Sequence, residues 1–338
     1  MSALPTAAVP ADESGTARMV VAELADGHVH SGQDLANSLG LTRAAVWKQV
    51  RQLRAHGLPV AAVPGRGYQL PWPVELLHEE RIRAAMPAEC RRAMADLQIA
   101  WRPGSTSEVL RQRARSLGLA PSVLLAESQS AGRGRRGRTW LAPPCANICL
   151  SLGLRFDCGA VGLAGLSLAA GVMVLRALTD TGFHQAGLKW PNDILAAGGK
   201  LAGVLTEIEG EYSGPSTVIL GLGLNLHLTE KMRAAAAQPV AELQSLMPEQ
   251  RVSRNALAAA LIAHLIRGLE QFRQHGFAAF AGEYARHDLL RGQPLRITTA
   301  QDEWYGQGAG VDAQGALLVQ SDAGLVRVDS AEVSVRTA

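Results

Sequence analysis

The stretch AGRGRRGRTW at residues 131–140 sets four arginines among three glycines. Its glycines spell the dinucleotide-binding pattern G-x-G-x-x-G, and Gly132 to Thr139 match a P-loop with arginine in place of lysine. Both motifs need a helix directly after the glycines, because free amides at the helix N-terminus hold the phosphates. Pro143 and Pro144 stand where that helix would run. We therefore reject both motifs and interpret the stretch as a mobile loop that an anionic ligand orders, with a plain solvated basic loop as the alternative.

Lysine is rare in this chain, because only four of the 33 basic residues are lysines, at positions 48, 189, 200 and 231. Lys189 and Lys200 lie in LKWPNDILAAGGKLAGVLTEIEG at 188–210, with Asn192 and Asp193 in a proline-led turn between them. A lysine in so arginine-rich a chain indicates a need for a compact ammonium group. Lysines and an aspartate near the arginine loop are suited to a nucleoside triphosphate and its Mg²⁺. The alternative is an ordinary turn with a surface salt bridge.

A third polar position follows the predicted strand STVILG, where GLGLN at 221–225 places Asn225 at a glycine-lined strand end. A simple β-bulge is the alternative. Trp140, at the end of the arginine loop, offers a flat surface for an aromatic base. No serine or cysteine occurs in a recognisable catalytic triad pattern, so the pattern favours charge stabilisation over nucleophilic catalysis.

The N-terminal part is predicted to be helical. Apolar periodicity indicates helices at Ala17–Ala25 and Gln33–Leu39, and Gly40-Leu41 forms the turn before a third helix that Thr42 caps and that ends at about Arg54. Two helices joined by a tight glycine-containing turn are typical of a helix-turn-helix.

The third helix has no acidic residue and carries Arg43, Lys48, Arg51 and Arg54. Its buried side is predicted to consist of Ala44, Val46, Val50 and Leu53. The following VAAVPGRGYQLP predicts a β-hairpin wing with Arg66 at its tip. The combination favours DNA binding, and a winged helix used only for protein contacts is the alternative.

Pro71-Trp72-Pro73 is a stiff link and the first predicted boundary. Beyond it, strands such as Leu97–Trp101 and Val123–Ala126 alternate with helices such as Glu108–Leu117 and Leu166–Thr179, which indicates an α/β or α+β domain. From residue 291 onward, PLRIT, EWYGQGAGV, GALLVQ, LVRVD and EVSVR are short strands separated by turns, as in a small β-barrel.

Composition limits the classes of protein to which the chain can belong. With 338 residues, 47% hydrophobic and 19% charged, the chain is predicted to be globular with two or three domains. A net charge of +3 excludes a wholly basic nucleic-acid coat. The first 16 residues lack the pattern of a signal peptide, and Val161–Leu175 is predicted to be a buried helix and not a membrane span. The four cysteines are predicted to be small core residues, and the chain to be cytoplasmic.

Three of these motifs, GRGRRGRTW, KWPND and GGKLAGVLTE, resemble in order and spacing the biotin protein ligases. HSGQDLANSLGLTRAAVWKQV and VPGRGYQLP resemble the bifunctional form of that family, which is also the biotin operon repressor. The likeness extends from about Ala17 to Val335. It implies an enzyme that uses ATP and Mg²⁺ to convert biotin to biotinyl-5′-adenylate and transfers biotin to a lysine of the biotin carboxyl carrier protein of acetyl-CoA carboxylase. Operator DNA and a ligand-promoted homodimer are the other implied partners.

The resemblance also implies site residues, among which Lys200 and Arg135 are catalytic and no side chain is a dedicated metal ligand. The residues implied to bind biotin are Ser105, Thr106, Ser107, Gln129, Gly132, Arg133, Gly134, Arg135, Lys200 and Gly203. The residues implied to bind the nucleotide are Arg138, Trp140, Lys189, Asn192, Asp193 and Asn225. The residues expected to bind DNA are Thr42, Arg43, Lys48, Arg51 and Arg66.

The implied architecture is a multidomain α+β chain. A disordered leader at 1–16 is followed by a winged helix-turn-helix at 17–72, a catalytic α/β domain related to class II aminoacyl-tRNA synthetases at 73–290, and an SH3-like barrel at 291–338. The chain departs from the family pattern at Ser107, where the usual motif has asparagine, and at Ala309, where repressor-type members often have arginine. Both departures bear on nucleotide binding and its coupling. The alternatives are a ligase without a DNA-binding role, a lipoate-type ligase and a ligand-sensing regulator without catalysis.

Overall fold

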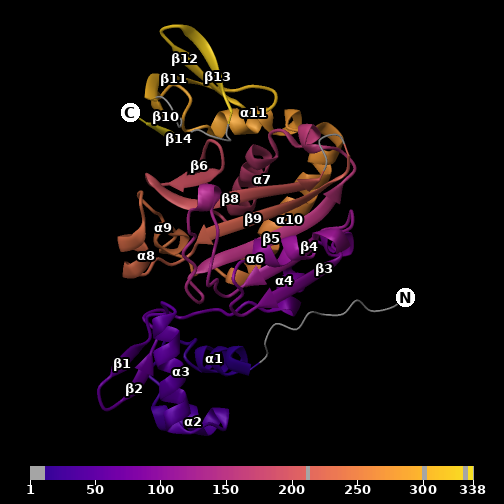
Figure 1. Ribbon diagram of the computed structural model, residues 1–338. Helices are drawn as coiled ribbons and strands as arrows, with labels where there is room; N and C mark the ends of the chain where they lie inside the picture. Colours follow the sequence, from indigo (N-terminus) through magenta and orange to yellow (C-terminus); the bar gives the residue numbers. More distant parts are fainter. Residues whose placement is uncertain (1–11, 211–213, 299–302, 330–333, 338) are drawn as a thin grey trace.

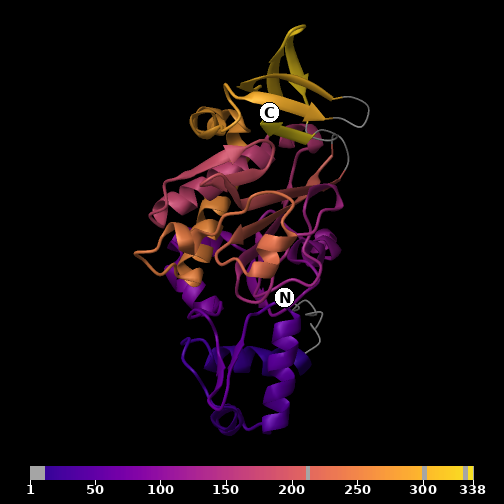
Figure 2. The ribbon, with the colours of Figure 1, turned by 90° about the vertical axis from the view of Figure 1, so that its left-hand side faces the viewer.

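The computed structural model describes residues 12–210, 214–298, 303–329 and 334–337. Both ribbon views show three parts arranged in a column (Figures 1 and 2). Helices and a hairpin form one end, a large sheet with its helices forms the middle, and a small sheet forms the other end. Residues 1–11 of the expected leader lie outside the described residues.

The N-terminal part contains α1 (Asp12–Glu23), α2 (Gly32–Leu39) and α3 (Arg43–Ala55). The expectation that the leader extends to residue 16 is wrong, because α1 is already helical from Asp12. Gly40 closes α2 with a left-handed φ of 63°, a conformation that glycine adopts without steric strain. The Thr42 hydroxyl accepts a hydrogen bond from the Ala45 amide at 3.2 Å, which confirms the predicted N-cap of α3.

Val46, Val50 and Leu53 form the buried side of α3 as predicted. Ala44, which was also expected there, is exposed, because its helical spacing places it on the opposite face. The hairpin strands β1 (Ala61–Val63) and β2 (Gly67–Gln69) pair antiparallel and confirm the predicted wing.

The middle part is built on a mixed sheet of seven strands in which only β3 and β4 pair in parallel. In spatial order the strands are β3 (Asp96–Ala100), β4 (Ser122–Ala126), β5 (Asn147–Phe156), β9 (Ser216–Asn225), β8 (Gly199–Gly210), β7 (Asp193–Ala196) and β6 (Ala186–Lys189). The predicted strands at 97–101 and 123–126 correspond to β3 and β4, each shifted by one residue at its start.

One face of this sheet is covered by α7 (Leu166–Asp180) and α10 (Arg254–His275), which pack on each other over a continuous apolar core. The helix α6 (Thr106–Gln112) lies on the other face. The remaining helices are α4 (Glu79–Ala85), α5 (Ala88–Ala93), η1 (Ala114–Ser116), η2 (Arg135–Gly137), η3 (Ala160–Leu163), α8 (Glu230–Ala235), α9 (Leu243–Leu246) and α11 (Ala278–His287). Residues 160–180 are long and apolar enough to cross a membrane, but 67% of that window is buried within the protein, as predicted for a core helix.

The C-terminal part is an antiparallel sheet in the order β13-β12-β11-β10-β14. Its strands are β10 (Pro294–Thr298), β11 (Glu303–Val311), β12 (Leu317–Ser321), β13 (Gly324–Val328) and β14 (Ser334–Thr337). The Trp190 indole donates a hydrogen bond to the Gly315 carbonyl at 3.0 Å, so the sheet is attached to the middle part next to the KWPND motif.

The segment after the winged helix is tied into the middle part by a buried ion pair. The Arg254 guanidinium lies 2.6 Å from Glu127 and donates to the Glu75 carbonyl at 2.7 Å, and Arg254 and Glu127 are 2% and 0% exposed. The Glu75 carboxylate accepts hydrogen bonds from Ser253 and from the Arg254 amide at the N-terminus of α10. Burial opposes the charged form of Glu75, but these hydrogen bonds and those from Asn255 outweigh it and lower its pKa.

A second attachment is the stack of Trp72 on His227, with ring centroids 4.8 Å apart. Burial lowers the pKa of His227 to about 4, so the folded protein favours the neutral ring. The unfolded state then binds more protons between the unfolded pKa, near 6.5, and about 4, and stability decreases as the pH falls through that window.

We therefore expect His227→Phe, which keeps a ring for Trp72, to resist acid better than the wild type. Urea unfolding at pH 7.5 and pH 4.5 measures the effect. Between these two pH values the free energy of unfolding of the wild type should decrease by about 1–2 kcal/mol more than that of the variant, a range that allows for the partial exposure of His227. An equal decrease in the free energy of unfolding in both proteins would show that protonation of His227 does not cause the loss of stability in acid.

Candidate active site and DNA-binding face

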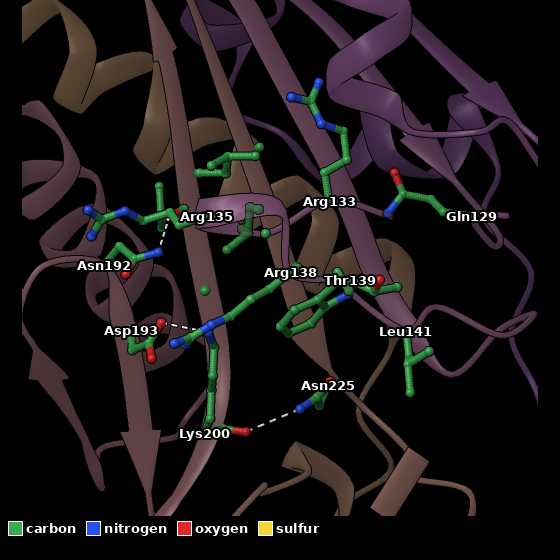
Figure 3. Close-up of a pocket in the computed structure, with 18 of the residues that line it drawn as sticks. Gln129, Arg133, Arg135, Arg138, Thr139, Leu141, Asn192, Asp193, Lys200 and Asn225 are labelled. Atoms are coloured by element: carbon green, nitrogen blue, oxygen red, sulfur yellow. Dashed lines mark hydrogen bonds and ion pairs between the residues drawn. The ribbon is translucent and has the colours of Figure 1, made fainter. Parts of the chain in front are cut away.

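A cavity of about 650 Å³ opens on the face of the seven-stranded sheet that carries α6 (Figure 3). Its walls come from the arginine loop, the KWPND turn, the ends of β8 and β9, and the segment around α8. The expected biotin and nucleotide residues that line it are Ser105, Thr106, Ser107, Gln129, Arg133, Gly134, Arg135, Arg138, Trp140, Asn192, Asp193, Lys200, Gly203 and Asn225. Residues far apart in the sequence are thus brought together.

The floor of the cavity is open because the strands carry glycine where a side chain would fill it. Asp193, Gly203 and Gly223 stand opposite one another on β7, β8 and β9. A Cβ atom at Gly223 would collide with the Trp140 indole, and one at Gly221 would collide with the Ser107 hydroxyl. Asn225 is the last residue of β9, as predicted, and the glycines that precede it allow side chains of other elements to lie on the sheet.

The arginine loop is folded as a small hairpin. The Trp140 amide donates to the Gly132 carbonyl at 2.9 Å, and the Gly134 amide donates to the Arg138 carbonyl at 2.7 Å. No helix suited to phosphate binding follows, as the two prolines predicted, and only the short turn η2 lies inside the loop. We predicted a mobile loop that a ligand orders, and these backbone hydrogen bonds define the hairpin conformation that the loop adopts in this structure.

Arg133 lines the cavity, but its guanidinium is paired with carboxylates of two neighbouring elements. Its guanidinium lies 3.0 Å from Glu108 of α6 and 3.1 Å from Glu207 of β8. Arg138 instead extends across the cavity in the direction of Asp193 (Figure 3). Burial lowers the pKa of Arg135, with a further contribution from neighbouring arginines, so an anion beside this loop would be electrostatically favoured.

Lys200 is the lysine that reaches the cavity. Its Nζ lies 2.6 Å from Asp193 Oδ1 and 5.7 Å from the centre of the Trp140 ring. Its carbonyl accepts a hydrogen bond from Asn225 Nδ2 at 3.1 Å, and Asn147 donates to the Asn225 amide oxygen at 2.9 Å. Asn225 also lines the cavity, and its amide group holds the backbone of Lys200 in place.

A chain of hydroxyl groups joins the start of α6 to β5. Gln129 Oε1 accepts from the Thr106 amide at 2.7 Å, and the Thr106 hydroxyl lies 2.7 Å from the Ser151 hydroxyl. Ser107 continues the chain with a hydroxyl 3.0 Å from Ser151. These polar groups, backed by α6, are suited to a small polar head group.

Two expected residues do not line the cavity. Gly132 is buried within the loop, where a Cβ would collide with the Trp140 carbonyl. Lys189 lies on β6 opposite Asp193 in register, outside the lining. Both lysines lie on strands, Lys189 on β6 and Lys200 on β8, and of the two only Lys200 lines the cavity.

The sequence interpretation missed one wall altogether, which α8 and the residues after it supply. The lining residues there are Leu228, Met232, Ala235, Ala236, Ala237, Gln238 and Val240. Its apolar character was visible in the sequence, but no local signal indicated that it faces the arginine loop. The cavity therefore has a cationic side and an apolar side.

At the other end of the molecule, all five expected DNA residues are exposed on α3 or the hairpin. They are Thr42, Arg43, Lys48, Arg51 and Arg66. Arg54 is directed elsewhere, because its Nε donates to the Val60 carbonyl at 2.6 Å. The sequence interpretation also missed Trp47, which is 51% exposed in the middle of the same helix.

Comparison with known families agrees with this arrangement. The model of the biotin/lipoate A/B protein ligase family matches residues 104–225, and that of the biotin protein ligase C-terminal domain matches residues 291–336. A helix-turn-helix domain model matches residues 19–69. The bifunctional ligase/repressor BirA of Escherichia coli is 34% identical over 94% of this chain and 97% of that protein. The chain belongs to the biotin protein ligase family, and it has the domain content of the bifunctional ligase/repressor BirA.

Other relatives have a narrower overlap. The biotin--[acetyl-CoA-carboxylase] ligase of Mycobacterium tuberculosis is 35% identical over 70% of this chain and 88% of that protein. The biotin protein ligase of Aquifex aeolicus, solved with biotin and ATP, matches the fold with a TM-score of 0.61 and 24% identity. The match covers 72% of this chain and 100% of that structure.

Proposed function

We propose that the cavity activates biotin with ATP to biotinyl-5′-adenylate and then passes biotin to a lysine of a carrier protein. The observation that carries this proposal is the position of Lys200, whose ammonium lines the same cavity as the hydroxyl groups of α6 and the arginine loop and lies 5.7 Å from the centre of the Trp140 ring. Attack of a carboxylate on the α-phosphate of ATP joins two anions and releases pyrophosphate. Positive charge fixed at the point of attack lowers the barrier of such a step.

The two halves of the cavity fit the two parts of the adenylate. We assign biotin to the pocket of Ser105, Thr106, Ser107, Gln129 and Gly203, and the phosphates to Lys200, Arg135 and Arg138. The apolar wall around α8 and the Trp140 indole, which line the same cavity, suit the adenine ring. The loop then excludes water from a product that hydrolyses readily.

Magnesium fits this site as a companion of the nucleotide. Asp193 is a carboxylate that lines the cavity close to Lys200, and Mg²⁺ in nucleotide sites commonly uses one or two carboxylates plus phosphate oxygens. Among the described residues, no cluster of three His, Cys, Asp or Glu side chains forms a separate metal cage. We therefore assign Asp193 to the ion that ATP brings with it.

Trp140→Ala is expected to weaken ATP binding more than biotin binding, because the indole lies on the nucleotide side. The loss should be about 1–3 kcal/mol if the indole stacks on the base. Calorimetric titration with each ligand measures the difference. Tyr305→Ala removes an exposed aromatic ring far from the cavity and is the matched control. Equal losses for both ligands would point to general damage of the loop.

ATP–pyrophosphate exchange with biotin as the varied substrate tests the proposed reaction and its substrate together. Exchange that depends on biotin supports the proposal, and exchange that depends on lipoate assigns the chain to the lipoate side of the family. If neither biotin nor lipoate supports exchange, the chain is a ligand-sensing regulator without catalysis. Transfer to the carboxyl carrier domain of acetyl-CoA carboxylase then tests the second step.

We also propose that the chain is a biotin-dependent repressor that dimerises when its site is filled. Operator affinity and self-association should both increase with biotin plus ATP, by a factor of about 5–150, the usual scale of coupling between two sites. DNA titration at fixed salt with apo protein, with biotin and with biotinyl-adenylate measures the coupling, alongside sedimentation. A flat operator affinity in adenylate-loaded protein would leave the ligase without a repressor role.

The finer architecture completes the proposal. We place the domain boundaries at 72/73 and 290/291. The apolar cluster of the winged helix extends beyond the first boundary to Trp101 and Cys145, so the winged helix also packs against the middle domain. We assign the middle domain to the class II synthetase relatives and the C-terminal sheet to SH3-like barrels. Ala309, the position of the second family departure, is exposed on β11 at an irregularity in the pairing with β12. A cytoplasmic location follows from the proposed use of ATP and DNA.

A further inference from the structure

The exposed face of α3 contains an aromatic residue that neither the ligase reaction nor the helix-turn-helix fold requires. Trp47 is 51% exposed, although a tryptophan side chain is usually well covered. Ala44, Trp47, Lys48 and Arg51 follow the spacing that places residues on one face of a helix, and all four are exposed. This face lies opposite Val46, Val50 and Leu53, which anchor the helix in its own core.

Arg51 is held against this tryptophan. Its guanidinium carbon lies 4.8 Å from the centre of the Trp47 ring, the geometry of a cation–π contact. Such a contact uses the face of the guanidinium and leaves the N–H groups at its edge available as a planar fork. Arg54 is directed to the Val60 carbonyl instead, so the stacked arginine is a distinct feature of the exposed face.

The charges around the pair identify DNA as the occupant of this face. Arg43 and Lys48 are exposed on the same helix, which has no acidic residue, and Arg66 is exposed at the tip of the neighbouring hairpin. A helix of 13 residues fits the major groove, where a guanine offers two acceptors to one arginine and a thymine offers a methyl group.

We propose that Trp47 and Arg51 are the base-reading pair of the winged helix. The indole packs on the C5 methyl group of a thymine, and the stacked guanidinium donates two hydrogen bonds to O6 and N7 of a nearby guanine. Arg43, Lys48 and Arg66 contact phosphates and position the helix. The inference rests on the proposed repressor function and adds the residues that give it sequence specificity.

The experiment starts from full-length protein with biotin and ATP and a pool of random 30-base-pair duplexes. The enriched site is then synthesised with each thymine replaced in turn by deoxyuridine and each guanine by 7-deazaguanine. Affinities are measured for the wild type, Trp47→Ala, Trp47→Phe and Arg51→Ala. Met19→Ala removes an exposed apolar side chain from α1, away from this face, and is the matched control. Circular dichroism verifies that each variant is folded.

We expect the wild type and Met19→Ala to lose about fourfold in affinity at one thymine of each half-site when its methyl group is removed. Trp47→Ala should bind more weakly and be insensitive to that change, and Trp47→Phe should retain part of the discrimination. Arg51→Ala should be insensitive to 7-deazaguanine at a position where the wild type loses at least about fivefold.

The outcomes separate the inference from the function on which it rests. If the wild type enriches no sequence, the repressor function fails and the inference fails with it. If the wild type enriches a site but Trp47→Ala keeps the same thymine profile, only the base-reading inference is overturned. If Trp47→Ala abolishes dimerisation but keeps the thymine profile of the wild type, Trp47 contacts protein and not DNA. This result also overturns the base-reading inference.

Discussion

Lys200→Ala is expected to reduce biotin-dependent ATP–pyrophosphate exchange by at least about 10²–10³-fold, the usual effect of removing one group that stabilises transition-state charge. Its Nζ is the only lysine ammonium that reaches the cavity among the described residues, and its partner Asp193 would be left without its cation. Lys200→Arg should also be poor. A planar guanidinium does not replace a compact ammonium that lies directly over Gly203, where a Cβ would come within 3.0 Å of it.

Lys231→Ala is the matched control, because this exposed lysine does not line the cavity. Circular dichroism and thermal unfolding should show that both Lys200 variants are folded. Near-normal exchange in Lys200→Ala and Lys200→Arg would remove Lys200 from the reaction, even if biotin-dependent exchange by the wild type stands.

Arg254→Ala is expected to lower the free energy of unfolding by about 3–5 kcal/mol at neutral pH, because it leaves the buried Glu127 carboxylate without its cation. The same change also removes the donor to the Asn147 carbonyl at 3.1 Å. Asn147 in turn holds Asn225, so adenylate formation should decrease along with stability. Urea unfolding and pyrophosphate exchange on the same samples measure both effects.

A double variant tests the cause. Glu127→Leu combined with Arg254→Met removes both buried charges, and it should recover part of the stability that Arg254→Ala loses. Recovery is incomplete because the Leu77 amide, which donates to Glu127 at 2.6 Å, is left without an acceptor. Arg267→Ala breaks an exposed pair with Glu89 and should leave stability nearly unchanged. An Arg254→Ala protein as stable as the wild type would show that the pair is not needed for folding.

Local patterns in the sequence were sufficient for the elements of the winged helix and for the strands β3 and β4, whereas the site residues were implied by the family resemblance. The cap at Thr42, the turn at Gly40 and the hairpin around Arg66 depend on neighbouring residues, so they were predicted correctly. The two prolines excluded a phosphate-binding helix after the arginine loop for the same reason. The start of α1 and the exposure of Ala44 were missed, because short apolar patterns leave helix ends and faces poorly defined.

Only the tertiary structure decided what each polar group does. Asn225, which is expected to bind the nucleotide, lines the cavity, and its amide also holds the Lys200 backbone and is itself held by Asn147, 78 residues away in the chain. Arg133, which is expected to bind biotin, lines the cavity and pairs with carboxylates of α6 and β8. The buried Arg254 and its partner Glu127, 127 residues apart, gave no signal in the sequence. A hydrogen bond or ion pair depends on positions a few ångströms apart in space, and chain folding sets those positions, so residue type and spacing specified the chemistry of this site but not its partners.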